Sequence, residues 1–296
     1  MSLPAFVPAG FGESPLFSHE QLLAALGGAA VRFDVAALAE CDSTNAVLSS
    51  LVEKAPSGTV IVADRQTAGR GRRGRQWQSS LADPGASLTF SLLRRFDTGM
   101  ERLAGLSLAV GVAVARGLGS LGVPLATAGG ANNGAGLKWP NDILVASPAD
   151  LAKLGGVLVE LQGGRDGVSA VIGIGLNLQA PPLAELTPGG LPVASLAGLP
   201  PFAGQQPPIR EAVLGAVLRQ LVQVLDAFAV QGFAACMEEW QGYHLWQGKA
   251  VQLLEQGEVL ASGICRGADA DGALLLESAG QLSRHWAGDV SLRELN

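Results

Sequence analysis

A glycine- and arginine-rich segment at 66–77, QTAGRGRRGRQW, lies between two apolar runs of the chain. The run at 59–66, TVIVADRQ, and the run at 87–95, SLTFSLLRR, have the composition and alternation of β-strands. Glycine lets backbone amides approach an anion closely, and arginine offers a planar charged fork that matches phosphate or carboxylate. The segment is therefore predicted to be a loop over an anionic ligand. It lacks the GxxxxGK[ST] spacing of a P-loop.

The alternative for this segment is a solvated RGG-type tail that contacts RNA. It is disfavoured because the repeat occurs once and apolar runs flank it. The formal net charge of −6 also makes the chain a poor general binder of nucleic acid or of anionic membranes. The five arginines between 65 and 75 form a local basic patch, which indicates a small anionic ligand.

The composition is that of a folded chain with an unusual amount of glycine. Of 296 residues 48% are hydrophobic and 16% charged, which excludes a disordered chain. This length allows one large domain or two smaller ones, and a core of this size needs no disulfide or metal to hold it. The 40 glycines are about twice the usual share. They either fill loops or lie where the backbone closely approaches something else.

Cysteine and histidine exclude several classes of site. The three cysteines, Cys41, Cys236 and Cys265, are far apart and form no CxxC pair, which indicates a reducing compartment. The three histidines are scattered, so a zinc site and a Ser-His-Asp system are not expected. The N-terminus lacks the features of a signal peptide. The longest apolar helical run, between Arg102 and Arg116, is shorter than the ~20 residues that cross a bilayer. We expect a cytoplasmic protein without a membrane segment.

Periodicity and turn residues predict alternating helices and strands. Ser18 and Gln21 form a capping-box pattern for a short helix, and Ser43 is the expected N-cap of a second helix. Further helices are expected at 101–118, 208–231 and up to Tyr243, and strands at 31–42, 59–66 and 87–95. The stretches 119–136 and 180–208 are expected to be surface loops, and 153–178 a hairpin that turns at 163–167. From 248 onward, short strands separated by turns predict a small β-barrel.

Two lysine-containing motifs are candidates for chemistry. KWPND at 138–142 gathers a lysine, an amide and a carboxylate in one turn, although Pro-Asn-Asp is ordinary turn chemistry as well. KLGG at 153–156 puts a lysine at the head of an apolar strand, where it either lies at a cleft or reaches solvent at the strand end. The chain contains only four lysines, so two of them fall in these two motifs.

Two polar or glycine-containing motifs complete the candidates. GIGLN at 173–177 is a strand lightened by glycine, which either admits a ligand or serves sheet packing. DSTN at 42–45 carries small hydroxyls and an amide at a helix start, where they could bind a compact polar group. For DSTN, capping of the helix by Ser43 is a sufficient structural explanation on local evidence.

Taken in order and with their spacing, DSTN, GRGRRGRQW, KWPND, KLGGVLVE and GIGLN resemble the biotin protein ligases, over about residues 38–296. The resemblance implies an α+β fold: a mixed β-sheet flanked by helices, of the class II synthetase-like type, followed by a C-terminal SH3-like β-barrel. The expected divisions are an N-terminal extension at 1–37, a catalytic biotin- and ATP-binding domain at 38–246 and the SH3-like domain at 247–296.

The resemblance implies an enzyme that uses ATP and Mg²⁺ to convert biotin into biotinyl-5′-AMP. The biotin is then transferred to a lysine of a biotin carboxyl carrier protein or domain. A lipoate or octanoate ligase of the same fold and a biotin-responsive transcription regulator are the alternatives. DNA binding is not expected, because fewer than 45 residues precede Asp42 and they suggest only one short helix. A homodimer would match many family members.

The resemblance also assigns binding residues. It gives the ureido head of biotin to Ser43, Thr44, Asn45 and Gln66. It gives biotin and the phosphates to loop residues, which are Gly69, Arg70, Gly71, Arg72, Arg73, Arg75 and Trp77. It gives the nucleotide and its metal to Lys138, Asn141 and Asn177, with Gly155 and Gly156 against the substrates. No metal held by protein side chains alone is expected, and no adenine contact is assigned within 180–208.

Four residues are predicted to be catalytic, namely Lys153, Arg72, Lys138 and Asp142. Lys153 would bridge the biotin carboxylate and the α-phosphate, where negative charge develops. An acceptor lysine with a pKa near 10.4 is mostly protonated at neutral pH. Asp142 is the candidate that orients or deprotonates it.

Overall fold

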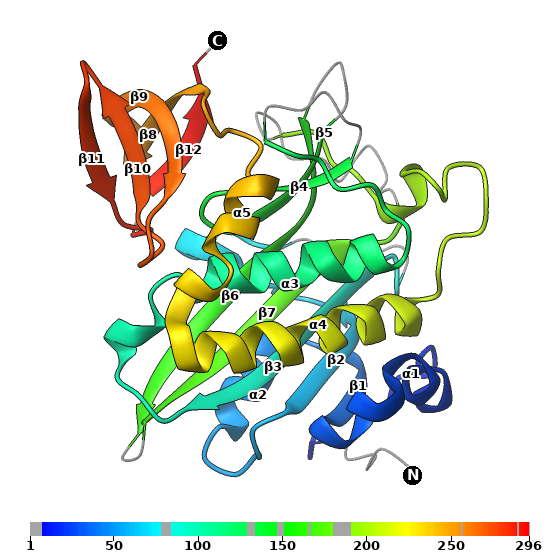
Figure 1. Cartoon of the computed structure of the whole chain (residues 1–296). Coiled ribbons are helices and arrows are strands. Elements are labelled where there is room, and N and C mark those ends of the chain that lie inside the picture. The colour runs from blue at the N-terminus through cyan, green and yellow to red at the C-terminus, as the bar shows by residue number, and fades with distance from the viewer. Residues whose placement is uncertain are drawn as a thin grey trace.

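A mixed seven-stranded sheet forms the centre of the molecule (Figure 1). The computed structural model describes residues 8–77, 84–128, 134–146, 151–164, 167–179, 191–255, 257–288 and 290–295, with only the backbone of Arg73. The strands are β1 (Asp34–Cys41), β2 (Thr59–Gln66), β3 (Ser87–Phe96), β4 (Gly134–Lys138), β5 (Asp142–Ala146), β6 (Leu151–Gly164) and β7 (Gly167–Asn177). Their order is β1-β2-β3-β7-β6-β5-β4. β1 and β2 are parallel and the other neighbours antiparallel, so the mixed sheet is confirmed.

Helices cover both faces of this sheet. They are α1 (His19–Leu26), α2 (Thr44–Leu51), α3 (Leu106–Ser120), α4 (Arg210–Gln231) and α5 (Met237–Tyr243). The 3-10 turns are η1 (Gly27–Arg32), η2 (Arg72–Gly74), η3 (Met100–Leu103), η5 (Leu196–Gly198) and η6 (Gly232–Ala235). Figure 1 shows α3 and α4 side by side across one face, and α1 packs against α4. α2 covers the opposite face.

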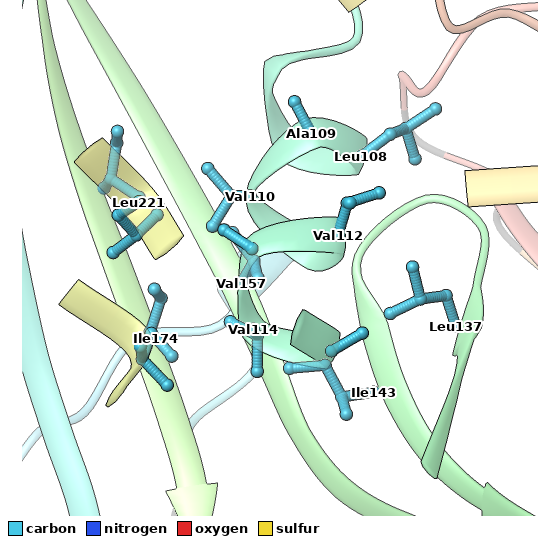
Figure 2. Packing of buried hydrophobic residues seen from close by; sticks show 14 of the residues in the cluster. Leu108, Ala109, Val110, Val112, Val114, Leu137, Ile143, Val157, Ile174 and Leu221 are labelled. Carbon is cyan, nitrogen blue, oxygen red and sulfur yellow. The ribbon is translucent and has the colours of Figure 1, made fainter. Parts of the chain in front are cut away.

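Strict alternation along the strands creates two cores. Val60 and Val62 of β2 belong to the larger core under α3 and α4, whereas Ile61 and Ala63 belong to the smaller core under α2. Successive side chains of a strand point to opposite faces, so a strand buried on both sides is apolar throughout. Figure 2 shows the larger core, where valines of α3 lie beside Val157 of β6.

A second sheet of five antiparallel strands follows α5, consistent with the expected SH3-like fold. Its strands are β8 (Ala250–Glu255), β9 (Glu258–Ala268), β10 (Leu274–Ser278), β11 (Gln281–His285) and β12 (Val290–Glu294), in the order β11-β10-β9-β8-β12. Trp139 joins the two sheets, since its buried Nε1 donates a hydrogen bond to the Gly272 carbonyl oxygen at 3.1 Å. The second sheet is thereby held against the KWPND turn.

Several predicted boundaries are confirmed and two need correction. Ser18 caps α1 by accepting a hydrogen bond from the Gln21 amide, as expected. The helix expected from 101 begins at Leu106, because Gly105 has a left-handed φ of 78° that an α-helix cannot continue through. Ser43 does precede α2, but its side chain makes no capping hydrogen bond. The 163–167 hairpin turn is confirmed by the pairing of β6 with β7.

The expected loops are only partly described. The predicted loop at 119–136 ends where β4 begins at Gly134, and 129–133 lie outside the described residues. Of the proline-rich stretch, 180–190 lie outside them, and 191–208 contain η5. By length and composition alone, two helical stretches could span a membrane, 100–120 and 210–235. The first is longer than the sequence prediction allowed, and most of each is buried against the rest of the fold.

All three cysteines are expected to be unreactive in the folded protein. Burial, with a contribution from Asp42, raises the pKa of Cys41 to about 12, and burial raises the pKa of Cys265 to about 11. Cys236 is buried in the same way. The thiolate is the reactive form, so a thiol reagent at pH 8 should modify none of them. The three thiols should react with the reagent only after unfolding in guanidinium. Rapid labelling of the native protein would contradict this burial.

Candidate active site

A cleft of about 910 Å³ brings all five sequence motifs together. The glycine–arginine loop, the KWPND turn and the starts of α2 and β6 line it, together with the end of β7. Two further walls come from residues 191–193 and from 290–293 of β12. Sequence reasoning assigned no residue to either of these walls. The cleft is therefore shared by the large sheet, the proline-rich stretch and the C-terminal sheet.

The glycine–arginine segment folds as a closed loop over the cleft. Its base is held by a hydrogen bond from the Trp77 amide to the Gly69 carbonyl oxygen (2.9 Å), and its interior by one from Gly71 to Arg75 (2.7 Å). A side chain on Gly69 would overlap the Trp77 carbonyl oxygen, so Gly69 is needed to close the loop and does not line the main cleft. Its predicted contact with substrate stays a prediction. The Arg73 side chain lies outside the described residues.

Arg72 links the loop to both sheets. Its guanidinium donates to the carbonyl oxygens of Ala287 (2.5 Å) and Gly288 (2.9 Å), which lie between β11 and β12 of the C-terminal sheet. It also approaches Asn141 Oδ1 at 3.4 Å, in the KWPND turn. Arg72 therefore lies where the loop, the lysine-bearing turn and the C-terminal sheet meet.

A buried polar network forms the cleft floor at the start of α2. Ser43, Thr44, Asn45 and Gln66 are each at most 6% exposed, and all four line the cleft. Gln66 Oε1 accepts hydrogen bonds from the Thr44 amide (2.8 Å) and hydroxyl (3.2 Å). Buried polar groups at the end of a cleft indicate a site for a compact polar ligand group, since they must be hydrogen-bonded.

Three hydroxyls on β3 extend this floor and were missed by the sequence analysis. Ser87 and Thr89 line the cleft, and Ser91 lies under it, with Oγ 2.8 Å from Thr44 Oγ1 and 2.5 Å from Asn45 Oδ1. The intervening residues, Leu88, Phe90 and Leu92, belong to the large core. The alternation of small hydroxyls with large apolar residues in SLTFSL was the available evidence, because it marks one polar face on a buried strand.

Lys138, Asp142 and Lys153 form a charged cluster that also lines the cleft. Asp142 Oδ2 lies 3.2 Å from Lys138 Nζ, and Asp142 Oδ1 lies 2.6 Å from Lys153 Nζ. The turn between β4 and β5 places Lys138 directly opposite Asp142, and β6 pairs alongside. Lys138 is buried and its ammonium lies 4.8 Å from the Trp246 ring centroid, whereas the Lys153 side chain is 37% exposed. Both lysines line the cleft, and Lys153 is the more exposed of the two.

The charges in this cluster are coupled. Burial alone would raise the pKa of Asp142, but Lys153 and then Lys138 outweigh it and hold the pKa at about 2. Burial lowers the pKa of Lys138 against the pull of Asp142. A carboxylate with so low a pKa is a weak base, and both of its oxygens are engaged. The predicted role of Asp142 in deprotonating an acceptor lysine is therefore disfavoured, and its geometry suits the positioning of Lys153.

The coupling predicts a defined acid dependence of stability. A depressed carboxyl pKa stabilises the folded state above the ordinary value of 3.8, and this contribution is lost as the pH falls toward 2. The loss should amount to about 2 kcal/mol of unfolding free energy. Urea unfolding at pH 5 and pH 2.5 measures it. The variant D142N should lose less stability over this interval, and an equal loss in variant and wild type would contradict the assignment.

Hydrogen bonds to backbone carbonyl oxygens fix the side chains of Asn141 and Asn177. The first KLGG glycine packs against a neighbouring strand. Asn141 Nδ2 donates to the Val157 carbonyl oxygen at 2.8 Å, which leaves Oδ1 toward Arg72. Asn177 Nδ2 lies 3.3 Å from the Lys153 carbonyl oxygen, within a set of bonds that joins β6 to residues 192–194. Gly155 packs against β7 and does not line the cleft, unlike Gly156, so its predicted contact with substrate is replaced by sheet packing.

Gly173 and Gly175 of β7 make room for other side chains of the protein. A methyl group on Gly173 would overlap Asn45 Oδ1, and one on Gly175 would lie 2.5 Å from Trp77 Cε2. Of the two explanations open from the sequence, close approach is therefore the one supported. Both glycines also line the cleft, so they give room to Asn45 and Trp77 at its surface.

The substitution G175A is expected to dislodge Trp77 and loosen the loop. Overpacking of this kind typically destabilises by about 1–3 kcal/mol. We expect a lower melting temperature, altered tryptophan fluorescence and weaker ligand binding. G242A is the matched control, since an added methyl there meets nothing within 4 Å. Unchanged fluorescence and binding in G175A would show that Trp77 does not rest on this strand.

The described residues contain no group of three or more histidine, cysteine, aspartate or glutamate side chains that could hold a metal ion. Asp142 is the carboxylate that lines the main cleft, and both lysines bind it. The donor set of these residues therefore does not fit a metal held by the protein alone.

Comparison with known proteins decides the family. Residues 38–177 match the model of the biotin/lipoate A/B protein ligase family. The chain is 33% identical over 280 residues to the bifunctional ligase/repressor BirA of Escherichia coli (strain K12), covering 94% of this chain and 78% of the relative. It is 32% identical to the biotin–[acetyl-CoA-carboxylase] ligase of Paracoccus denitrificans, covering 81% of this chain and 92% of that protein. The chain belongs to the biotin protein ligase family.

The fold agrees with that of solved biotin protein ligases. The biotin protein ligase from Aquifex aeolicus in complex with biotin and ATP matches with a TM-score of 0.67 and 28% sequence identity, covering 88% of this chain and 99% of that one. The family resemblance and the fold predicted from sequence motifs are thereby confirmed. Within this family fold, the cleft described above contains every motif on which the resemblance rested.

Proposed function

We propose that this chain is an ATP-dependent biotin ligase that forms biotinyl-5′-AMP and transfers biotin to a lysine of a biotin carboxyl carrier protein or domain. The proposal rests on one observation. A buried polar floor, a lysine cluster and an arginine-rich loop line the same cleft. The comparisons support the same activity, since the relatives are named as biotin ligases. The polar floor would hold the ureido head, and the cluster would hold the reacting carboxylate and phosphates.

The first step joins two anions. A biotin carboxylate oxygen bonds to the α-phosphorus of ATP, the bond from that phosphorus to the bridging oxygen breaks, and pyrophosphate leaves. Fixed cations must offset the charge that gathers in the transition state. Lys153 is the exposed member of the cluster, and Asp142 fixes its ammonium group. Arg72 would close the site from above, and the buried Lys138 would hold Asp142 from the other side.

The second step transfers the acyl group. The acceptor lysine amine attacks the carbonyl carbon of the mixed anhydride, an amide bond forms and AMP leaves. Water would compete with this attack, so the loop must cover the intermediate. Arg70, Arg72, Arg75 and Trp77 line the cleft from this loop and would form the cover.

Mg²⁺ would enter with its substrate. Mg²⁺ in nucleotide enzymes is usually bound through phosphates and one or two carboxylates. Because Asp142 is occupied by both lysines, we propose that the ion would arrive as MgATP, and that Asn141 of the KWPND turn would be the uncharged side chain that could supply an oxygen ligand.

The floor favours biotin over lipoate, the alternative substrate of this fold. The ureido ring of biotin carries two N–H donors and a carbonyl acceptor, whereas the dithiolane ring of lipoate carries no strong hydrogen-bonding group. Thr44, Asn45 and Gln66 would lose hydrogen bonds to the dithiolane ring, and unpaired buried polar groups reject a ligand strongly. A transcription regulator without ligase activity would not need the lysine cluster.

We further propose the division into an extension at 1–37, a catalytic domain at 38–246 and an SH3-like domain at 247–296. α1 of the extension packs against α4 and so contributes to the catalytic fold. We propose no DNA or membrane partner and a cytoplasmic location, which the three buried free cysteines support. A homodimer could not form by pairing the outer edge of β1 with a second copy, because Ser14 N and Gly12 O already form hydrogen bonds with that edge.

Transfer assays test the substrate. The purified chain is incubated with ATP, Mg²⁺ and a biotin carboxyl carrier domain, with biotin or lipoate as the acid, and the domain is weighed by mass spectrometry. We expect the mass of one biotinyl group, dependent on ATP, and no lipoyl group. Lipoylation without biotinylation would favour the alternative, and a biotin-dependent gel shift of promoter DNA would favour a regulator.

A further inference from the structure

Glu160 of β6 is the last residue of the KLGGVLVE motif, and no contact with substrate was assigned to it. It does not line the main cleft but contacts Asn45 of the polar floor. We infer that Glu160 is a positioning residue: it fixes the orientation of the Asn45 amide in the head-group pocket and couples this amide to Arg70 of the loop. The inference rests on the proposed biotin activity and concerns how that site selects its ligand. Its evidence is a continuous set of contacts among described residues.

Asn45 occupies a closely fitted slot. It is 3% exposed, and its Nδ2 donates to Glu160 Oε2 at 2.7 Å. Its Oδ1 lies 2.5 Å from Ser91 Oγ and rests against Gly173, where any side chain would overlap it. The side chain therefore cannot move away from the pocket without displacing a strand. What remains to be determined is which end of the amide faces the ligand.

Glu160 determines that orientation. An ionised carboxylate only accepts hydrogen bonds, so the amide nitrogen of Asn45 must face Glu160. The amide oxygen then lies beside Ser91 and Gly173, and Gly173 lines the cleft. The Ser91 hydroxyl has one proton, which can bond either Asn45 Oδ1 or Thr44 Oγ1. Asn45 Oδ1 has two lone pairs and so keeps acceptor capacity for a ligand N–H. This is the complement of a ureido N–H group.

The same carboxylate contacts the loop. Glu160 Oε1 lies 3.6 Å from Arg70 Nη1, with the two side chains 35% and 53% exposed. An ion pair this exposed contributes little stability by itself. It does place Arg70 over the residue that holds Asn45. One carboxylate thus joins the loop to the pocket floor, and loop position and head-group binding should depend on each other.

Kinetics of Glu160 variants test the inference. We expect E160A to raise the KM for biotin about tenfold, because the Asn45 amide nitrogen loses its closer, charged partner at 2.7 Å and keeps only the Leu158 carbonyl oxygen at 3.5 Å. We expect E160Q to raise it about threefold, because a glutamine amide can pair with Asn45 in either orientation. The KM for ATP should stay near wild type in both variants, and the melting temperature should fall less in E160Q than in E160A. E258Q, an exposed glutamate on β9, is the matched control.

Coupling to the loop is tested by a double-mutant cycle with R70A. If Glu160 acts through Arg70, the rise in KM for biotin in R70A/E160A should be smaller than the product of the two single rises. An unchanged KM for biotin in E160A would overturn the inference. So would a parallel rise in both KM values with a lower melting temperature, since that is a purely structural effect. Failure of the wild type to bind biotin in calorimetry would instead refute the proposed function.

Discussion

Replacing Lys153 with alanine is expected to reduce biotinyl-5′-AMP formation by roughly 100- to 1,000-fold, the effect of removing one group that stabilises transition-state charge. Lys153 is the half-exposed cation of the cluster, and its ammonium is fixed 2.6 Å from Asp142 Oδ1. Because the group is needed where the two anions meet, kcat should fall more than biotin affinity. Biotin-dependent ATP–pyrophosphate exchange measures this step directly.

The control is K54A, which removes an exposed lysine near the end of α2. It should exchange at the wild-type rate, and both variants should melt near the wild-type temperature. If K153A exchanged as fast as wild type, Lys153 would be only a strand-end lysine, the alternative that the sequence left open.

Replacing Asp142 with asparagine is expected to damage both stability and the first half-reaction. Lys138 is buried, and removing the charged partner of a buried ion typically costs about 3–5 kcal/mol. Lys153 loses the contact that fixes its ammonium group, so adenylate formation should fall at least about 100-fold. Urea unfolding and pyrophosphate exchange measure the two effects.

The two half-reactions separate positioning from base catalysis. If Asp142 acts by holding Lys153, transfer from preformed biotinyl-5′-AMP in D142N should decline much less than adenylate formation. If Asp142 deprotonates the acceptor lysine, transfer should show the larger loss. The second result would restore the role first assigned to Asp142 from the sequence. The low pKa of this carboxyl group argues for the first result.

Local patterns in the sequence predicted most of the fold. The helix cap at Ser18 and the turn of KWPND depend on residues a few positions apart, and both are confirmed. The capping box is not completed, because the Ser18 amide donates to Glu211 and not to the Gln21 side chain. The start of α3 was predicted about five residues early, because amphipathic periodicity continues through 101–104 while the left-handed Gly105 interrupts the helix. The backbone conformation of a glycine is not visible in a hydrophobic pattern.

The motifs also identified the cleft, but they did not indicate the two other stretches of chain that line it. Residues 191–193 and 290–293 line it because the chain returns to β6 and places β12 beside the KWPND turn. Neither stretch has a local pattern that indicates a site. The hydroxyls of β3 were visible as an alternation, yet their meaning depends on Asn45 and Thr44 more than forty positions earlier.

The contacts of three motif residues in the folded chain were not evident from their motifs. Gly69 and Gly155 were assigned to substrate, and the structure uses them to close the loop and to pack β6 on β7. Ser43 was explained locally as a helix cap, yet it lines the cleft with its side chain uncommitted to the helix end. A sequence motif indicates that a residue belongs to the site but does not distinguish ligand contact from support.

Capture of the intermediate is the most direct test of the proposed activity. The chain is incubated with biotin and ATP labelled at the α-phosphate, separated from free nucleotide, and then mixed with a biotin carboxyl carrier domain. We predict that label stays with the protein only when biotin is present, and that the carrier domain releases it as AMP while gaining biotin. Absence of bound label with biotin, or label retained with lipoate in its place, would contradict the account.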